Sequence, residues 1–305
     1  MLHLLAIATS IALATASGQP AVEAPACSVG ARPPRALLLG DSNIHGSLGT
    51  ELERALQALG YRTDRFGRPG SGLARPDYYD WLDEASALVS AADPDVVFFM
   101  AGGNDGQGLT PLGPGQRHVA YDDDERWDAE YAARVVELVS LLGAGERPVY
   151  FLSPTNRRPR TARERMGRVR RVQQRALAGL PEVAWIDMFP LTTDGAGRYL
   201  WRERDPQGHL QLLRASDGIH LTRSGGKVVG ARLIRELIAE GLPIFGSDCP
   251  PQAPGSVMAP EGRQHPGRRQ PPPAVEGRGG ATGRDAPPPT LRARRGSRSS
   301  PPSGR

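Results

Sequence analysis

An uninterrupted apolar run that stops at a polar turn constrains the fold of this chain more than any other feature. Residues Ala36–Leu39 are all apolar, and Gly40-Asp41-Ser42 follows them directly. Such a run is typical of a strand that is buried on both faces of a sheet. The turn then presents the Ser42 hydroxyl at the carboxyl end of the strand, where ligands bind in open α/β sheets. We therefore take Ser42 as a candidate nucleophile.

Further short apolar runs alternate with segments of helical spacing. In Leu48–Leu59 the leucines recur every three or four residues up to Gly60, which is a helix-ending signal. This alternation predicts an α/β fold, a five-stranded parallel sheet covered by helices on both faces. The predicted strands are 36–39, 61–66, 95–101, 148–153 and 183–187. The predicted helices are 48–59, 78–91, 128–142, 161–178 and 222–242, the last broken at its start by Gly225-Gly226.

A single domain accounts for most of the 305 residues. Residues 1–27 are expected to be a signal peptide with a short leader, because Leu2–Ala16 is nearly all apolar or small and Ala14-Thr15-Ala16 matches a cleavage pattern. The segment 250–305 has 13 Pro and 9 Gly, and it cannot bury enough apolar surface to offset its ordering entropy. We predict a folded domain over 28–249 and a disordered tail. The protein is expected to be exported, either periplasmic or secreted, with envelope association as a further option and no stable membrane span.

The basic composition of the whole chain does not extend to this domain. The chain has 38 Lys and Arg against 33 Asp and Glu. The segment 250–305 holds 10 Arg and 3 acidic residues, which leaves 28 basic and 30 acidic residues in 1–249. Since a nucleic-acid-binding domain needs a basic surface, the composition argues against a nucleic-acid partner.

The two cysteines, Cys27 and Cys249, flank the predicted domain. In an exported protein a disulfide between them would join the two ends of the domain. Two free thiols are the equally weighted alternative. A mass that does not change under reduction would exclude the disulfide.

A nucleophilic serine needs a general base and a group that orients it. Asp217-Gly218-Ile219-His220 precedes the last predicted helix. With a glycine between them, the carboxylate can meet one ring nitrogen of His220 while the other nitrogen points outward. An Asx turn at Asp217 is the purely structural alternative.

The developing oxyanion also needs hydrogen-bond donors. Asn104 follows the most apolar predicted strand, in Gly102-Gly103-Asn104-Asp105, and its amide is a neutral donor. The backbone N–H groups of Gly72 and Ser42 are further candidates. A simple turn after a strand would explain the Asn104 segment equally well in isolation.

Taken in order, these segments resemble the four sequence blocks of the SGNH (GDSL-type) hydrolase family. The blocks are Gly40-Asp41-Ser42, Gly72, Gly103-Asn104-Asp105 and Asp217-Gly218-Ile219-His220, and the resemblance covers about residues 35 to 243. The stretches 72–81 and 103–107 look like those of one poorly characterised bacterial branch. Asn43-Ile44 replace the usual Leu-containing continuation after the serine.

The resemblance implies a flavodoxin-like, three-layer α/β/α sandwich. It also implies Ser42 as nucleophile, His220 as base and Asp217 as its orienter, with Ser42, Gly72 and Asn104 forming the oxyanion hole. The expected activity is that of a serine esterase that releases short acyl groups through an acyl-enzyme and needs no cofactor and no metal. O-acetyl groups on a carbohydrate are one candidate substrate, alongside small-molecule esters.

Three other functions remain open from the sequence. The first is an O-acyltransferase or accessory protein acting on envelope polysaccharide, and the second is a non-catalytic carbohydrate-binding protein. The third, a metal-dependent phosphoesterase, usually needs denser His and Asp clustering than this chain has. Four further side chains are candidates for contact with the substrate: Asp41, Asp105, Arg75 and Arg214.

Overall fold

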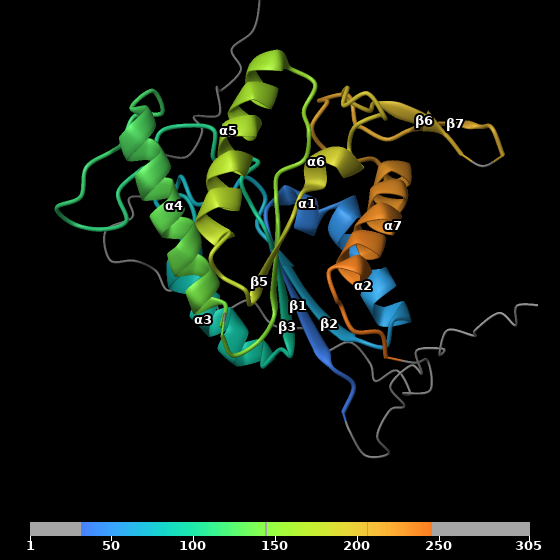
Figure 1. Ribbon diagram of the computed structural model, residues 1–305, viewed down its shortest axis with the longest axis horizontal. Helices are drawn as coiled ribbons and strands as arrows, with labels where there is room; N and C mark the ends of the chain where they lie inside the picture. Colours follow the sequence, from blue (N-terminus) through green and yellow to red (C-terminus); the bar gives the residue numbers. More distant parts are fainter. Residues whose placement is uncertain (1–31, 144, 206, 246–305) are drawn as a thin grey trace, which may run out of the picture. The chain divides into compact units, whose positions relative to one another are not determined.

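A five-stranded parallel sheet is the centre of the computed structural model, which describes residues 32–143, 145–205 and 207–245 (Figure 1). The strands are β1 (Arg35–Gly40), β2 (Arg62–Gly67), β3 (Val96–Met100), β4 (Val149–Leu152) and β5 (Val183–Ile186). Their order is β2-β1-β3-β4-β5, and every neighbouring pair is parallel. All five predicted strands are therefore confirmed, with boundaries that shift by one or two residues.

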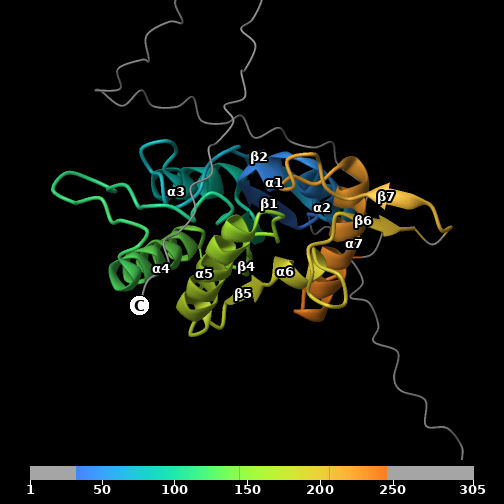
Figure 2. The ribbon, with the colours of Figure 1, turned by 90° about the horizontal axis from the view of Figure 1, so that it is seen from above.

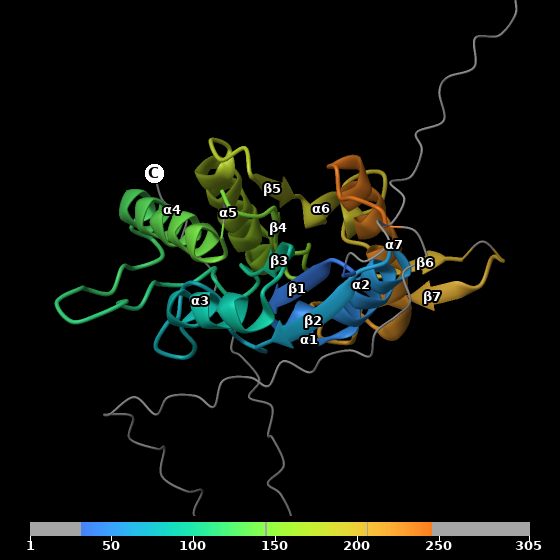
Figure 3. The same cartoon turned by 90° about the horizontal axis from the view of Figure 1, so that it is seen from below.

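Helices cover both faces of this sheet, as Figures 2 and 3 show. One face carries α2 (Ser47–Ala58) and α7 (Arg223–Ala239), and the other carries α3 (Trp81–Ala92), α4 (Asp124–Leu141) and α5 (Arg160–Leu177). Side chains of one strand alternate between the two cores, because successive residues point to opposite faces. In β1, Leu37 and Leu39 join the core under α3–α5, whereas Leu38 joins the core under α2 and α7. The predicted three-layer α/β/α sandwich is confirmed.

The predicted break at Gly225-Gly226 was wrong. Helix α7 begins at Arg223, capped by the Thr222 side chain, and runs through both glycines. A Cβ atom on Gly226 would lie 2.7 Å from the Ser47 carbonyl oxygen, and one on Gly225 would lie 1.9 Å from that of Leu213. The glycines are therefore needed where α7 packs closely against α2 and against the segment before it.

Two small elements between β5 and α7 were not predicted from the sequence. A short helix, α6 (Met188–Leu191), follows β5, and an antiparallel hairpin pairs β6 (Arg202–Arg204) with β7 (Leu210–Leu212). The hairpin strands have three residues each and stay largely exposed, so they lack the apolar run that marks a buried strand. Another short helix, α1 (Ser42–His45), follows β1 directly.

Within the described ranges, no helix combines the length and apolar character that crossing a membrane requires. The predicted signal peptide, the tail and the cysteines Cys27 and Cys249 lie outside the described residues.

Candidate active site

The turn after β1 places Ser42 at the carboxyl edge of the sheet, as the first residue of α1. The chain stays against β3 as it turns, because Asp41 N–H donates to the Met100 carbonyl at 3.0 Å. A Cβ atom on Gly40 would lie only 2.2 Å from that carbonyl oxygen, so a larger residue does not fit. Asp41 then caps α1 by accepting from the Asn43 backbone N–H at 2.8 Å. The Gly-Asp-Ser sequence is therefore the local cause of where Ser42 sits.

His220 and Asp217 converge on Ser42 from the far end of the chain. The Nε2 atom of His220 lies 2.9 Å from Ser42 Oγ, and its Nδ1 atom lies 2.7 Å from Asp217 Oδ2. The other carboxylate oxygen, Oδ1, accepts from the backbone N–H groups of Ile219 and His220 at 2.8 and 3.0 Å. Gly218 has φ +68° in this turn, a conformation that glycine adopts without strain. The structure thus brings the three predicted triad residues into the order Ser–His–Asp.

The surroundings of Asp217 favour its ionised form. Its partial burial opposes ionisation, but hydrogen bonds from the His220 ring and from two backbone N–H groups outweigh that effect and lower the pKa of Asp217 to about 2. An ionised carboxylate at Nδ1 makes the His220 tautomer with a free Nε2 lone pair the favoured neutral form. Nε2 can then accept the proton of the Ser42 hydroxyl.

Ser42, Gly72 and Asn104 are the three residues expected to supply oxyanion donors, and the structure shows what each of these donors bonds to. The backbone N–H groups of Ser42 and Gly72 donate no hydrogen bond to any acceptor among the described residues. Asn104 Nδ2 donates one hydrogen bond to the Ser71 carbonyl at 2.9 Å, which leaves its second N–H for another acceptor. These are the three donors that the sequence motifs predicted.

Buried polar side chains hold the loop that carries Gly72. Asp105 Oδ1 accepts from Ala74 N–H at 3.0 Å, and Oδ2 accepts from the Tyr131 hydroxyl at 2.7 Å. From α4, Arg134 donates to the Leu73 carbonyl at 2.8 Å. Burial raises the pKa of Asp105, although the hydrogen bonds from the loop and from Tyr131 oppose the shift. The loop is therefore tied to the core on both sides.

Asp41 and Asp105 were expected to contact substrate, and their placement argues against it. Both are almost completely buried, at 1% and 0% exposure. Burial also raises the pKa of Asp41, against the effect of its hydrogen bonds from Asn43. Both carboxylates position backbone around Ser42 and Gly72, which is a supporting role.

The structure also places Arg75 and Arg214 differently from the expectation. Arg75 forms a two-point ion pair with Asp77 at 2.8 and 2.7 Å at the surface. Arg214 is buried and donates to the Ile219 carbonyl at 2.6 Å and to the Asn156 carbonyl at 3.0 Å. Its burial lowers its pKa to about 10. Arg214 thus links the Asp217–His220 turn to the loop after β4. Because its side chain is buried and already donates to these carbonyl groups, it is not placed to contact a substrate.

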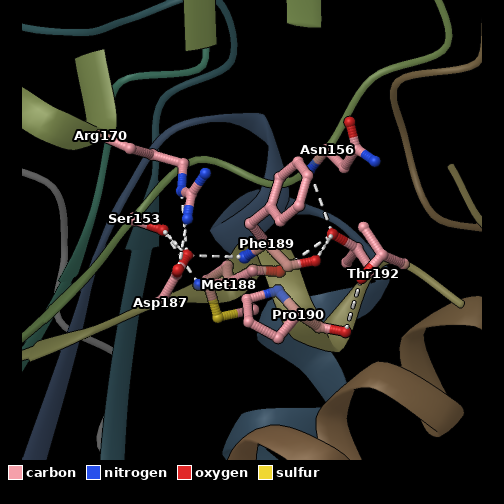
Figure 4. Close-up of polar contacts among 9 residues, drawn as sticks. Ser153, Asn156, Arg170, Asp187, Met188, Phe189, Pro190 and Thr192 are labelled. Carbon is pink, nitrogen blue, oxygen red and sulfur yellow. Dashed lines mark hydrogen bonds and ion pairs between the residues drawn. The ribbon is translucent and has the colours of Figure 1, made fainter. Parts of the chain in front are cut away.

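That loop is fixed by a second polar network, around the ends of β4 and β5 (Figure 4). Asp187 caps α6, accepts from Ser153 Oγ at 3.3 Å and pairs with Arg170 of α5. The hydroxyl of Thr192 accepts from Asn156 N–H at 3.0 Å. The network sets the course of the chain on both sides of residue 156.

Sequence reasoning missed Arg157, which follows directly in this loop. With Asn104, it lines a pocket of about 510 Å³ between the loop after β3 and the start of α5. The only signal in the sequence was its place after a buried strand, at the edge of the sheet where ligands bind. No group of three or more His, Cys, Asp or Glu side chains in the described ranges is arranged to hold a metal ion.

A family model described as "Protein of unknown function (DUF459)" matches residues 35–236. No curated protein matches the chain. A GDSL-like lipase from Bacteroides thetaiotaomicron is 18% identical, with 68% of this chain and 89% of that chain covered and a TM-score of 0.45. An alpha/beta hydrolase from the metagenome of Lake Arreo, Spain, is 21% identical, with 69% and 96% covered and a TM-score of 0.48. A variant of an acetyl xylan esterase from Geobacillus stearothermophilus is 18% identical, with 71% and 98% covered and a TM-score of 0.48.

Proposed function

We propose that this chain, which belongs to the DUF459 family, is a serine esterase that hydrolyses short acyl esters. DUF459 is an SGNH-like family, which confirms the resemblance that the four sequence blocks indicated. The observation that supports the activity best is the pair of contacts at His220, 2.9 Å to Ser42 Oγ and 2.7 Å to Asp217 Oδ2. A histidine between a hydroxyl and a carboxylate is the arrangement that nucleophilic catalysis by serine requires.

The first step forms an acyl-enzyme. Ser42 Oγ attacks the ester carbonyl carbon as His220 Nε2 takes its proton, and Asp217 stabilises the resulting imidazolium. The negative charge on the carbonyl oxygen is met by the N–H groups of Ser42, Gly72 and Asn104. When the carbon–oxygen bond of the ester breaks, His220 returns the proton to the departing alcohol.

The second step repeats this chemistry with water. His220 takes a proton from a water molecule, the hydroxide attacks the acyl carbon, and Ser42 leaves with the proton from His220. The enzyme is thereby regenerated and a free carboxylic acid is released. An O-acetyl group on a carbohydrate is a candidate substrate, and a sugar hydroxyl in place of water would make the same residues a transferase.

Hydrolysis of p-nitrophenyl acetate by the full chain tests the proposal. Wild type should turn over, Ser42→Ala should lose at least about 10³-fold in kcat, and Ser86→Ala, an exposed serine of α3, should match wild type. Equal activity of wild type and Ser42→Ala would show that Ser42 is not the nucleophile. If the folded wild type is silent, added acetylated polysaccharide and a sugar acceptor decide between a transferase and a binding protein.

We also propose that the protein is exported, on the basis of the apolar segment at residues 2–16. N-terminal sequencing of the protein from a bacterial host should show cleavage within residues 14–27. An intact Met1 in the mature protein would contradict this.

A further inference from the structure

Arg157 lies beside the proposed catalytic centre and has no ion-pair partner in the part of the chain that the structure describes. In the described residues its guanidinium makes no hydrogen bond and no ion pair, and only its backbone N–H is engaged, with Asn156 Oδ1 at 2.8 Å. The side chain is partly buried, so it does not have the full hydration of a surface arginine. A guanidinium in such a position has five N–H donors to offer to a ligand.

Its location is fixed relative to the oxyanion donor Asn104. A Cβ atom on the preceding residue, Gly103, would lie 2.8 Å from Arg157 Nη2 and 2.9 Å from Asp41 Oδ2. The guanidinium therefore packs directly on the backbone of Gly103, where a larger residue would displace it. Gly103 directly precedes Asn104, so the guanidinium lies against the residue next to the amide that is expected to meet the ester carbonyl oxygen.

The pocket that Arg157 lines is suited to an anion. Its lining includes Arg157, Arg165, Gln107, Thr161 and Asn104, and it contains no acidic side chain. Arg165 is held there by a hydrogen bond to the Gly106 carbonyl at 2.9 Å. Two guanidinium groups with neutral polar neighbours suit a carboxylate, since guanidinium matches the two oxygens of that group.

The acidic groups nearby do not satisfy Arg157. Burial lowers its pKa, while the charges of Asp41, Asp105 and Asp217 oppose that shift without forming an ion pair. Asp105 accepts hydrogen bonds from Ala74 and Tyr131, and Asp41 Oδ1 accepts both of its hydrogen bonds from Asn43. Asp41 Oδ2 lies on the same side of Gly103 as the guanidinium but forms no ion pair with it among the described residues. Because an arginine side chain is not deprotonated in proteins, the guanidinium keeps its charge and its N–H donors.

We propose that Arg157 binds a carboxylate group of the ester substrate, so that the preferred substrates are anionic esters. The inference rests on the proposed esterase function and adds the substrate class to it. Two kinds of ester meet this requirement. In one, the acyl group carries the carboxylate, as in a hemiester of a dicarboxylic acid. In the other, the carboxylate belongs to the alcohol part, as in an O-acetylated acidic sugar.

Matched pairs of esters separate these two sources. On the acyl side, p-nitrophenyl hemisuccinate is compared with p-nitrophenyl butyrate, which has the same number of acyl carbons. On the alcohol side, 4-acetoxybenzoate is compared with 4-acetoxybenzamide. For each pair the ratio of kcat/KM for the anionic ester to that for the neutral ester is measured, for wild type, Arg157→Gln and Arg157→Lys.

In the pair that matches the natural source, Arg157→Gln should lower this ratio about 10- to 100-fold, the effect of one hydrogen bond to a charged group. Arg157→Lys should restore part of it, and high salt should lower the ratio in wild type. The control Arg171→Gln, which removes an exposed arginine of the same helix that follows the loop, should leave the ratio unchanged. Unchanged ratios in both pairs for Arg157→Gln, or equal losses on anionic and neutral esters, would overturn the inference.

Succinate tests the pocket without turnover, which keeps this inference separable from the proposed function. Thermal unfolding of wild type and of Arg171→Gln should shift upward with succinate, and that of Arg157→Gln should not. This result would support the anion site even if no ester is hydrolysed. No shift in wild type, or the same shift in all three proteins, would contradict it.

Discussion

In the proposed mechanism the carboxylate of Asp217 acts only through His220, and a few hydrogen bonds favour its charged form. Because its pKa is about 2, below its ordinary value, its favourable interactions are fully present above about pH 4 and are lost as the pH falls through about 2. Activity lost between pH 7 and pH 4 should therefore come from protonation of another group. The chain keeps this residue ionised throughout the range in which an esterase would work.

Replacement of Asp217 by asparagine tests that role. The amide can still face Nδ1 but favours the wrong tautomer of His220. The kcat for p-nitrophenyl acetate should therefore fall by about 10⁴, as it does for the same change in a serine protease. The control Asp122→Asn, at an exposed position, should match wild type. Loss of less than tenfold for Asp217→Asn would show that the carboxylate does not orient the base.

Asn104 offers a second test at the scale of one side chain. Asn104→Ala removes one oxyanion donor and should lower kcat about 10²–10³-fold. Its melting temperature should stay near that of wild type, because only one partly buried hydrogen bond, to the Ser71 carbonyl, is lost. Full activity in a folded Asn104→Ala protein would remove this residue from the oxyanion hole.

Some site residues could be placed from the sequence and others could not. Ser42, Asn104 and His220 follow strands or precede a helix in recognisable motifs, so their convergence followed from topology. The burial of Asp105 and the free guanidinium of Arg157 did not, because each depends on which distant side chains pack around it. For a carboxylate next to a motif, the sequence does not show whether the side chain supports the site from the core or contacts the substrate.

At the scale of elements, the loop after β2 has to pass very close to Asp105. A Cβ atom on Gly72 would lie 2.0 Å from Asp105 Oδ1, the oxygen that accepts from Ala74 N–H. Gly72→Ala should therefore push the loop away from the core, lowering stability by about 1–3 kcal/mol and kcat by at least about tenfold. Gly113→Ala, where a Cβ meets no atom within 4 Å, is the matched control. A Gly72→Ala protein with wild-type stability and kcat would show that the contact relaxes freely.

The elements that the sequence predicted are those with a buried face. Each strand of the sheet is a continuous apolar run, and the large helices have apolar residues at regular spacing. The hairpin β6–β7 has neither, since Leu210 and Leu212 are exposed. Its two strands are held by pairing with each other. A prediction based on the pattern of apolar residues does not detect such pairing.

At the scale of the whole molecule, the fold encloses two carboxyl groups on the same edge of the sheet. Asp41 and Asp105 are almost fully buried, and neither has an ion-pair partner among the described residues. Burial raises the pKa of each, with hydrogen bonds opposing the shift only in part. Since ionised carboxylates are costly to bury, the stability of the protein should depend on pH through these groups.

Asp105 gives this dependence its direction. A carboxyl whose pKa is raised in the folded state leaves stability intact below its ordinary pKa of about 4, and stability is lost as the pH rises through the raised value. The asparagine side chain of the Asp105→Asn protein cannot ionise, so this protein does not lose stability through position 105 as the pH rises. Thermal unfolding of both proteins from pH 4 to pH 8 should therefore show the melting temperature of Asp105→Asn gaining on that of wild type as the pH rises. The exposed control Asp122→Asn should follow wild type at every pH. A gap that stays constant, or that moves in favour of wild type, would mean that the hydrogen bonds from Ala74 and Tyr131 outweigh the cost of burying the charge.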